Sequence, residues 1–164
     1  MSETENLWKI FESTSKLIRF SDTKAIALLA TNGVITSFYL SNINLVKDIL
    51  AQRSISIFLL MLTVTCLLFC VYFSLRCIFP SLKKNMNCNL VFYQDIVDFH
   101  NDANEYEIAI KESFKNTDAL QAQLTHAIWA ISQIAKDKYF AVSMSIIFFV
   151  VALFANMAFI LMAI

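Results

Sequence analysis

The chain has 164 residues, of which 58% are hydrophobic and 16% are charged, and its formal net charge is zero. An ordinary globular domain is about half apolar and about a quarter charged, so this composition predicts more apolar surface than a soluble core of this size buries. The zero net charge argues against a polyanion-binding protein, and we therefore expect no nucleic acid partner.

Residues 1–24 predict a cytoplasmic amphipathic helix. Apolar side chains recur along one face with helical spacing, and basic and acidic side chains occupy the other face. Such a helix has two physical uses: its apolar face sinks into the inner leaflet of a membrane, or it packs on the protein's other cytoplasmic helices. The sequence leaves both open. At the end of this segment, Asp22 and Lys24 are expected to pair or to cap the mouth of the next helix.

Three stretches without Asp, Glu, Lys or Arg predict transmembrane helices at 25–46, 54–75 and 139–164. About 20 apolar residues in a helix cross the hydrocarbon core of a bilayer. The second and third stretches are strongly apolar. The first contains several Ser, Thr and Asn residues and is the weakest of the three, and its alternative is a buried helix of a soluble protein. A short loop at 47–53 and a longer segment at 76–138 connect the spans.

The positions of Lys and Arg predict the orientation of the spans. Eleven of the 13 basic residues lie before the first span or between the second and third, and only Lys47 and Arg53 lie in the loop 47–53. Because cytoplasmic loops carry the excess of basic residues, we expect the N-terminus and 76–138 in the cytoplasm. The loop 47–53 and the C-terminus are then expected on the outer side.

The segment 76–138 is expected to form helices after a break at Pro80. Pro80 lacks a backbone donor and does not continue the second span, and residues 89–97 are rich in aromatic and β-branched side chains, which favours a short strand or an extended piece. Asp102 and Asp118 each precede a Glu or Gln by three residues, as at capped helix starts. The expected helices are 102–115 and 118–138, the second running directly into the third span. The predicted fold is an all-α integral membrane protein with a helical cytoplasmic segment.

The helix expected at 118–138 has two different faces. An apolar stripe repeats with a period of 3.6 residues and must pack against other side chains. On the opposite face, Trp129, Gln133 and Lys136 place a ring, an amide and a cation on neighbouring turns. Such a set can stack a base and hold a phosphate, or Trp129 packs under another helix or subunit. With cations and a ring from earlier in the segment, the candidate ligand contacts are Lys83, Lys84, Tyr93, Trp129, Gln133 and Lys136.

Polar side chains inside the spans are candidates for helix packing or for a pore, because hydrocarbon offers their hydrogen-bonding groups no partner. In the second span, small and weakly polar residues recur every three or four positions and predict a seam along which helices approach closely. Packing within the chain, self-association and a water path all remain open for them. The candidates are Asn32, Thr36, Thr63, Cys66, Cys70, Ser74 and Asn156.

No pattern in the sequence predicts an enzyme. The single glycine, Gly33, excludes Gly-rich phosphate loops, and neither His100 nor His126 has a nucleophile at a spacing typical of a catalytic triad. The four cysteines form no C-x-x-C pair and have no histidine at metal-ligand spacing. We therefore expect no catalytic residue, no disulfide framework and no metal site.

Short motifs, taken in their order along the chain, resemble those of one family. They are SDTKA at 21–25, FP at 79–80, NLVFYQDI at 89–96, Tyr106 in the following helix, and WAISQIAKDKY at 129–139. Together with the layout of spans, they resemble the membrane effectors of Pycsar, the pyrimidine cyclase system for antiphage resistance, of the PycTM type. The resemblance extends from about residue 5 to the end, and no single motif is diagnostic.

This resemblance implies a bacterial defence with two components. A partner pyrimidine nucleotide cyclase makes cyclic CMP or cyclic UMP on phage infection, and the effector impairs the inner membrane, so that the cell dies before phage mature. The resemblance thus implies a protein of the bacterial inner membrane. With the spans and the orientation predicted above, we expect a multi-pass protein with a cytoplasmic N-terminus and a periplasmic C-terminus. Familiar cyclic-nucleotide modules contain a β-roll with a phosphate cassette, which this chain lacks, so the position of the nucleotide site stays open.

The leading hypothesis is therefore a ligand-gated membrane disruptor that forms homo-oligomers in contact with lipid. Its activating ligand is expected to be cyclic CMP or cyclic UMP, with no other cofactor. Two alternatives bind no nucleotide. One is a structural or adaptor membrane protein, and the other is a holin-like pore former controlled by its abundance.

Overall fold

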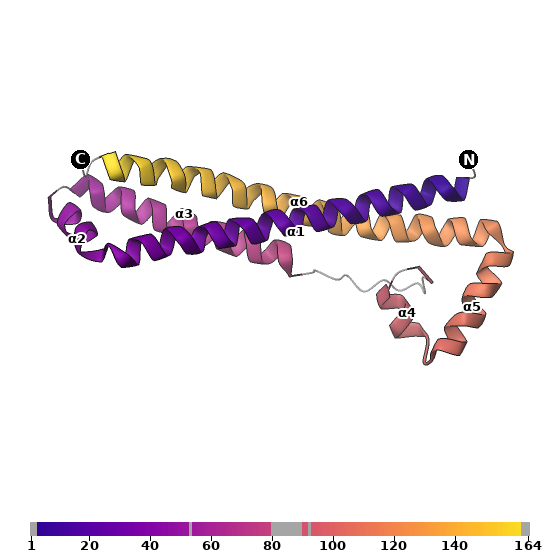
Figure 1. Cartoon of the computed structure of the whole chain (residues 1–164). Coiled ribbons are helices and arrows are strands. Elements are labelled where there is room, and N and C mark those ends of the chain that lie inside the picture. Colours follow the sequence, from indigo (N-terminus) through magenta and orange to yellow (C-terminus); the bar gives the residue numbers. More distant parts are fainter. Residues whose placement is uncertain (1–2, 53, 80–89, 92, 162–164) are drawn as a thin grey trace. The chain divides into compact units, whose positions relative to one another are not determined.

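The computed structural model describes residues 3–52, 54–79, 90–91 and 93–161. Within these ranges every regular element is an α-helix, which confirms the all-α prediction (Figure 1). The helices are α1 (Glu3–Ser41), α2 (Ile43–Gln52), α3 (Ser54–Ile78), α4 (Tyr93–Phe99), α5 (Ala103–Lys115) and α6 (Thr117–Leu161).

The chain divides into two compact units. The first, here called the head unit, contains Met1–Arg19 and Ser81–Lys136, and the second, the bundle unit, contains Phe20–Pro80 and Asp137–Ile164. Both α1 and α6 are continuous helices that contribute one part to each unit. The predicted amphipathic helix and first span are thus parts of one helix.

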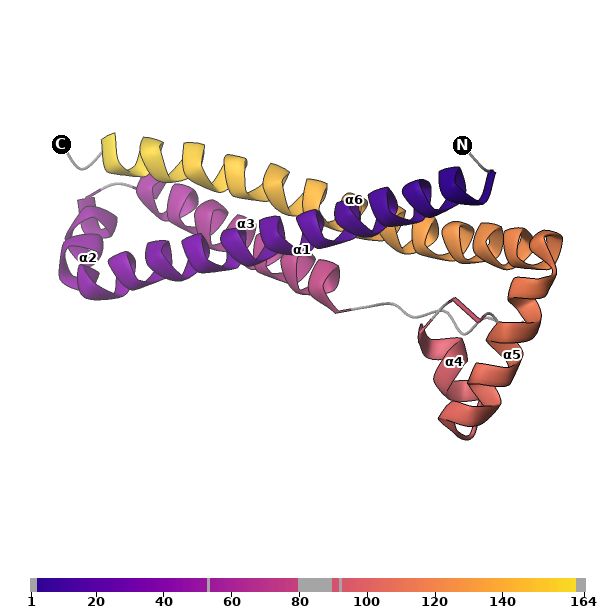
Figure 2. The ribbon, with the colours of Figure 1, turned by 45° about the vertical axis from the view of Figure 1, so that its right-hand side comes forward.

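The bundle unit packs α3 beside the second parts of α1 and α6 (Figure 2). Asp22 of α1 contacts Lys138 of α6 at one end, and Tyr39 contacts Asn156 at the other, so α1 and α6 are parallel. Because Cys77, near the end of α3, also contacts Asp22, α3 is antiparallel to both. The three helices therefore alternate in direction along the sequence.

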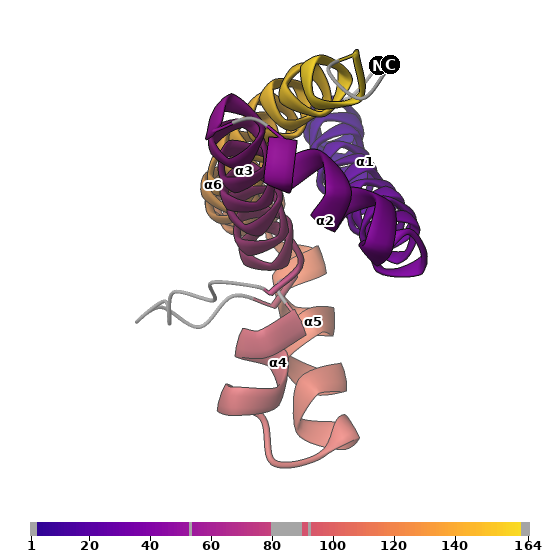
Figure 3. The same ribbon diagram turned by 90° about the vertical axis from the view of Figure 1, so that its left-hand side faces the viewer.

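The helix α2 crosses one end of the bundle (Figure 3). Val46 and Ile49 of α2 are buried with Phe159 of α6. This contact explains why residues 47–53, predicted as a loop, are helical up to Gln52: the segment has an apolar face, and a helix buries that face while satisfying its own backbone. The position of 47–53 as the periplasmic connection between spans stays a prediction, and α1 ends at Ser41 before the predicted limit of the first span.

Buried positions in the bundle recur at intervals of seven residues, the repeat that keeps one seam of a helix facing its neighbours. In α3 and α6 most of them are small or polar, which lets helix backbones approach closely. In α3 they are Ser56, Thr63, Cys70 and Cys77. In α6 they are Lys138, Ser145, Ala152 and Phe159.

The outer surface of the bundle is apolar. Large side chains such as Phe58, Leu68 and Phe154 are about two-thirds exposed, whereas Thr63 and Ser145 are buried. A soluble protein has the reverse arrangement, and small polar residues between helices with apolar residues outside are typical of a membrane protein. Among the described residues, Ile55–Ile78 and Thr117–Leu161 are helices long and apolar enough to cross a membrane. The more polar α1 is not among them.

The head unit contains the capped helices. Asp102 Oδ1 accepts a hydrogen bond from the Glu105 amide at 2.7 Å, as the spacing predicted, and Glu105 Oε2 accepts one from the Asn101 amide at 2.9 Å. The cap of α6 differs from the prediction. Asn116 Oδ1 accepts from the Ala119 amide at 3.3 Å, and Asp118 lies in the first turn, where its charge favours the helix dipole.

The strand or extended piece predicted at 89–97 is wrong for the described residues. Leu90 and Val91 form a turn, and α4 begins at Tyr93. The Tyr106 hydroxyl donates a hydrogen bond to the Leu90 carbonyl at 3.0 Å and fixes this turn. A strand needs a partner for its backbone groups, whereas a helix satisfies its own.

The cap of α5 provides a local test of the head unit. Replacing Asp102→Ala removes an acceptor for the first-turn amides and is expected to destabilise that turn by about 1 kcal/mol. Hydrogen exchange followed by mass spectrometry should show exchange about fivefold faster at the start of α5. The exposed Asp98→Ala change in α4 removes the same charge without a cap, and equal exchange in both variants would contradict the assignment.

Candidate functional site

A network of hydrogen bonds joins α1, α3 and α6 inside the bundle. Asn32 Nδ2 donates to Cys70 Sγ at 3.1 Å, and the Ser145 hydroxyl donates to the Cys70 carbonyl at 2.9 Å. Ser74 Oγ lies 2.6 Å from Ser145 Oγ. Because Ser145 has one hydroxyl hydrogen and gives it to Cys70, Ser74 is the donor in that pair. We call Asn32, Cys70, Ser74 and Ser145 the polar seam; none is more than 3% exposed.

The other predicted packing residues satisfy their polar groups in different ways. Tyr39 of α1 donates to Asn156 Oδ1 of α6 at 2.6 Å. The hydroxyls of Thr36 and Thr63 each donate to a carbonyl four residues earlier in their own helix at 2.9 Å, which removes the need for an interhelical partner. Cys66 is buried on the same face of α3 as the seam. Asn32 Oδ1 alone among the seam atoms is buried without a hydrogen-bond partner in the described structure.

An ion pair also joins α1 to α6 in the bundle unit. Lys138 Nζ of α6 is 2.5 Å from Asp22 Oδ1 of α1, and the Lys138 side chain is only 10% exposed. The thiol of Cys77 lies 3.9 Å from the same carboxylate oxygen. Asp22 therefore links α1 to both other helices of the bundle.

The structure does not bring the predicted pair Asp22 and Lys24 together. Lys24 Nζ instead lies 4.2 Å from the centre of the Phe20 ring. Side chains two residues apart on a helix point to different sides, so Asp22 reaches α6 while Lys24 stays on the surface of α1.

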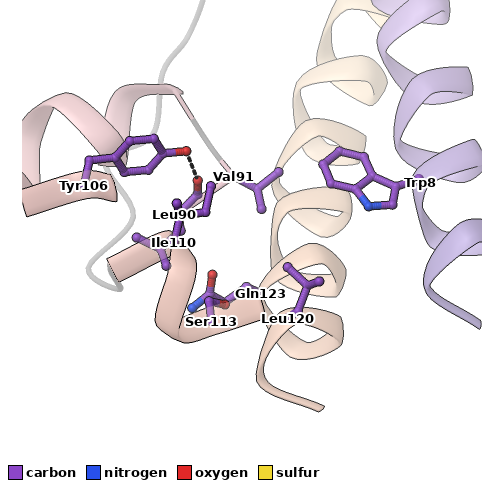
Figure 4. A pocket seen from close by; sticks show the side chains of 8 residues that line it. All are labelled: Trp8, Leu90, Val91, Tyr106, Ile110, Ser113, Leu120 and Gln123. Atoms are coloured by element: carbon purple, nitrogen blue, oxygen red, sulfur yellow. Dashed lines mark hydrogen bonds between the residues drawn. The ribbon is translucent and has the colours of Figure 1, made fainter. Parts of the chain in front are cut away.

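The head unit contains a cavity of about 170 Å³ between its helices (Figure 4). Its walls come from α1, the turn at 90–91, α5 and the start of α6, and most of its lining is apolar or aromatic. The lining residues are Trp8, Leu90, Val91, Tyr106, Ile110, Ser113, Leu120 and Gln123. Ser113 is 7% exposed, and its hydroxyl oxygen has no hydrogen-bond partner among the described residues.

The first part of α1 packs on α6 in the head unit, which is one of the two uses predicted for the amphipathic helix. Gln121 Nε2 of α6 donates to Thr4 Oγ1 at 3.4 Å. The outer face of this part carries ion pairs with a spacing of four residues, including Lys16 with Glu12 at 2.8 Å. The hydrogen bond and positive charge of Lys16 lower the pKa of the Glu12 carboxyl.

The predicted ligand contacts that the structure describes do not line the cavity. Trp129, Gln133 and Lys136 lie on the exposed face of α6, with Trp129 61% exposed, opposite the buried stripe that the sequence predicted. Lys83, Lys84 and the side chain of Tyr93 lie outside the described residues. In the described part of the chain, no group of His, Cys, Asp and Glu side chains is arranged to hold a metal ion.

The sequence matches the PycTM family, whose description is the Pycsar effector protein domain, over residues 6–164. The chain belongs to the PycTM family. This match confirms the resemblance found in the motifs and covers nearly all of both units. With its two strongly apolar helices, this PycTM chain is a membrane effector of antiphage defence. No curated protein and no solved structure matches it.

The ion pair of this PycTM chain gives a prediction for stability. Replacing Asp22→Ala leaves the buried Lys138 ammonium without its partner, and we expect a loss of up to about 3 kcal/mol in thermal unfolding measured in detergent. The double variant Asp22→Ala with Lys138→Met removes both charges and should recover most of this loss.

The exposed neighbour Asp137 offers a matched control, since Asp137→Ala removes the same charge outside the buried pair. A single Asp22→Ala variant as stable as Asp137→Ala would contradict the role assigned to the pair.

Proposed function

We propose that this PycTM chain is a ligand-gated membrane disruptor that responds to cyclic CMP or cyclic UMP. A partner pyrimidine nucleotide cyclase supplies the ligand on phage infection. The effector then impairs the bacterial inner membrane, and the infected cell dies by abortive infection. The observation that carries the proposal is the bundle with a hydrogen-bonded interior and an apolar exterior, in a chain that belongs to the Pycsar effector family.

In this proposal α1, α3 and α6 each cross the membrane. Their alternating directions are those that three consecutive spans require. The polar side chain of Asn32 points into the bundle, and the exposed Thr31 hydroxyl donates to the Ala27 carbonyl at 2.9 Å, so it needs no partner from lipid. These bonds lower the cost of placing α1, the most polar of the three, in hydrocarbon.

The distribution of basic residues supports an orientation with the N-terminus and the head unit in the cytoplasm and the C-terminus in the periplasm. This orientation exposes the head unit to a nucleotide made inside the cell. The protein acts as a receptor joined to a membrane-active bundle, and the proposed activity requires no catalytic residue.

Ligand binding to the head unit is coupled to membrane damage through α1 and α6, because both helices contribute to both units. A ligand shifts the resting and active populations only as far as its affinities for the two states differ. The residues of the polar seam are buried between the helices of one chain. We therefore expect the active state to contain several copies whose spans have repacked. The partnerless Asn32 Oδ1 provides an acceptor for a donor from water or from a second copy in such an assembly.

Leakage from liposomes tests this function. Purified protein reconstituted into dye-loaded vesicles should release dye on addition of cyclic CMP or cyclic UMP, and cyclic AMP should have no effect. Vesicles without protein provide the control for nucleotide alone. Failure of every cyclic pyrimidine nucleotide to bind in calorimetry would favour a structural or adaptor protein, and release of dye without nucleotide would favour a holin-like pore former.

A further inference from the structure

The size of the head-unit cavity limits what enters it. The cavity measures about 170 Å³, and an apolar cavity of about 150 Å³ accommodates one benzene ring. There is therefore room for a single six-membered ring. A complete nucleotide is larger than this volume.

The side chains that line the cavity are of the kinds that stack on the flat faces of such a ring. Trp8 of α1 and Tyr106 of α5 contribute aromatic side chains, and Leu90 and Ile110 contribute aliphatic ones (Figure 4). Aromatic and aliphatic side chains stack on the π-face of a nucleic acid base whatever its hydrogen-bonding edge. The hydrogen bond from Tyr106 to the Leu90 carbonyl fixes two parts of this wall relative to each other.

The cavity also contains a group that is suited to the polar edge of a base. Ser113 lies in the lining, nine-tenths buried, and its hydroxyl has no partner among the described residues. A hydroxyl both donates and accepts, so it can bond to the amino group, ring nitrogen or carbonyl of a pyrimidine. Buried hydroxyls in folded proteins are normally hydrogen-bonded, and a ligand that supplies this bond accounts for the exception.

We propose that this cavity receives the pyrimidine ring of the activating nucleotide, with the sugar and cyclic phosphate at its mouth. The proposal rests on the function proposed above and assigns the site within it. None of the described residues that line the cavity is charged, which agrees with a neutral base inside and the anionic phosphate outside. A six-membered pyrimidine ring fits this volume more readily than a bicyclic purine.

The cavity differs from the face predicted from sequence. Trp129 on that face is 61% exposed and offers one open side to a base, whereas Trp8 is 42% exposed and lines the cavity together with Leu120 of α6. A bound ring would therefore contact the two helices that also form the bundle unit.

The two tryptophans of the chain, Trp8 and Trp129, distinguish these sites by fluorescence. In the Trp129→Phe variant the emission comes from Trp8 alone, and titration with cyclic CMP or cyclic UMP should change it with the midpoint measured by calorimetry on the wild-type protein. In the Trp8→Phe variant, which keeps a ring at the site, Trp129 emission should not respond. A response of Trp129 with a silent Trp8 would overturn the assignment.

A variant that fills the cavity gives a second readout. Ser113→Leu places a larger side chain in the lining and should weaken nucleotide binding at least tenfold. The matched control is Ser132→Leu, on the exposed side of α6, which should bind like the wild type. Unchanged binding in Ser113→Leu would place the ligand elsewhere while leaving the proposed function intact, whereas no binding by the wild-type protein would overturn both.

Discussion

The hydrogen bonds of the polar seam are the interaction on which the rest of the structure depends. A polar side chain without a partner in hydrocarbon costs several kcal/mol, and the seam gives such groups from three helices their partners. Ser145 is its centre, because it contacts the backbone and side chain of Cys70 and the hydroxyl of Ser74. Asn32 then joins α1 to the same place. Without these bonds the Asn32 side chain of α1, the least apolar of the three helices, would be buried in the bundle with no polar partner.

The ion pair and the polar seam are the contacts through which α1 and α6 would connect the proposed ligand binding to the membrane. Both helices are continuous through residues where their side chains change from head-unit to bundle contacts. Asp22 and Lys138 lie just inside the bundle unit on these two helices and hold them together by charge. Removing one partner of a buried ion pair is costly, because it leaves the other charge without compensation.

Much of the fold follows from sequence patterns, whereas the contacts between segments do not. The absence of charge over residues 54–75 and 139–164 predicted two apolar helices, and Asp102 with Glu105 predicted a cap that the structure contains. The buried stripe of α6 and the exposed Trp129 also followed from helical periodicity. Ser145 and Tyr39 were missed, although Ser145 lies seven residues after the buried Lys138 and a search for heptads would have found it. The cavity had no such signal, because Trp8 of α1 and Leu90 meet the α5 residues Tyr106 and Ser113 only through the packing of distant segments.

The central claim, that α1 crosses the membrane as one wall of a hydrogen-bonded bundle, is tested most directly by labelling cysteines in cells. Lys47 in α2 and Lys16 in the head-unit part of α1 are exposed. Each is replaced with Cys in a chain that also carries Cys88→Ser. The cysteines Cys66, Cys70 and Cys77 are buried and stay in place. With the outer membrane permeabilised, an impermeant maleimide should label position 47 while the inner membrane is intact, and position 16 only after its lysis. Labelling of both positions only after lysis would contradict the account.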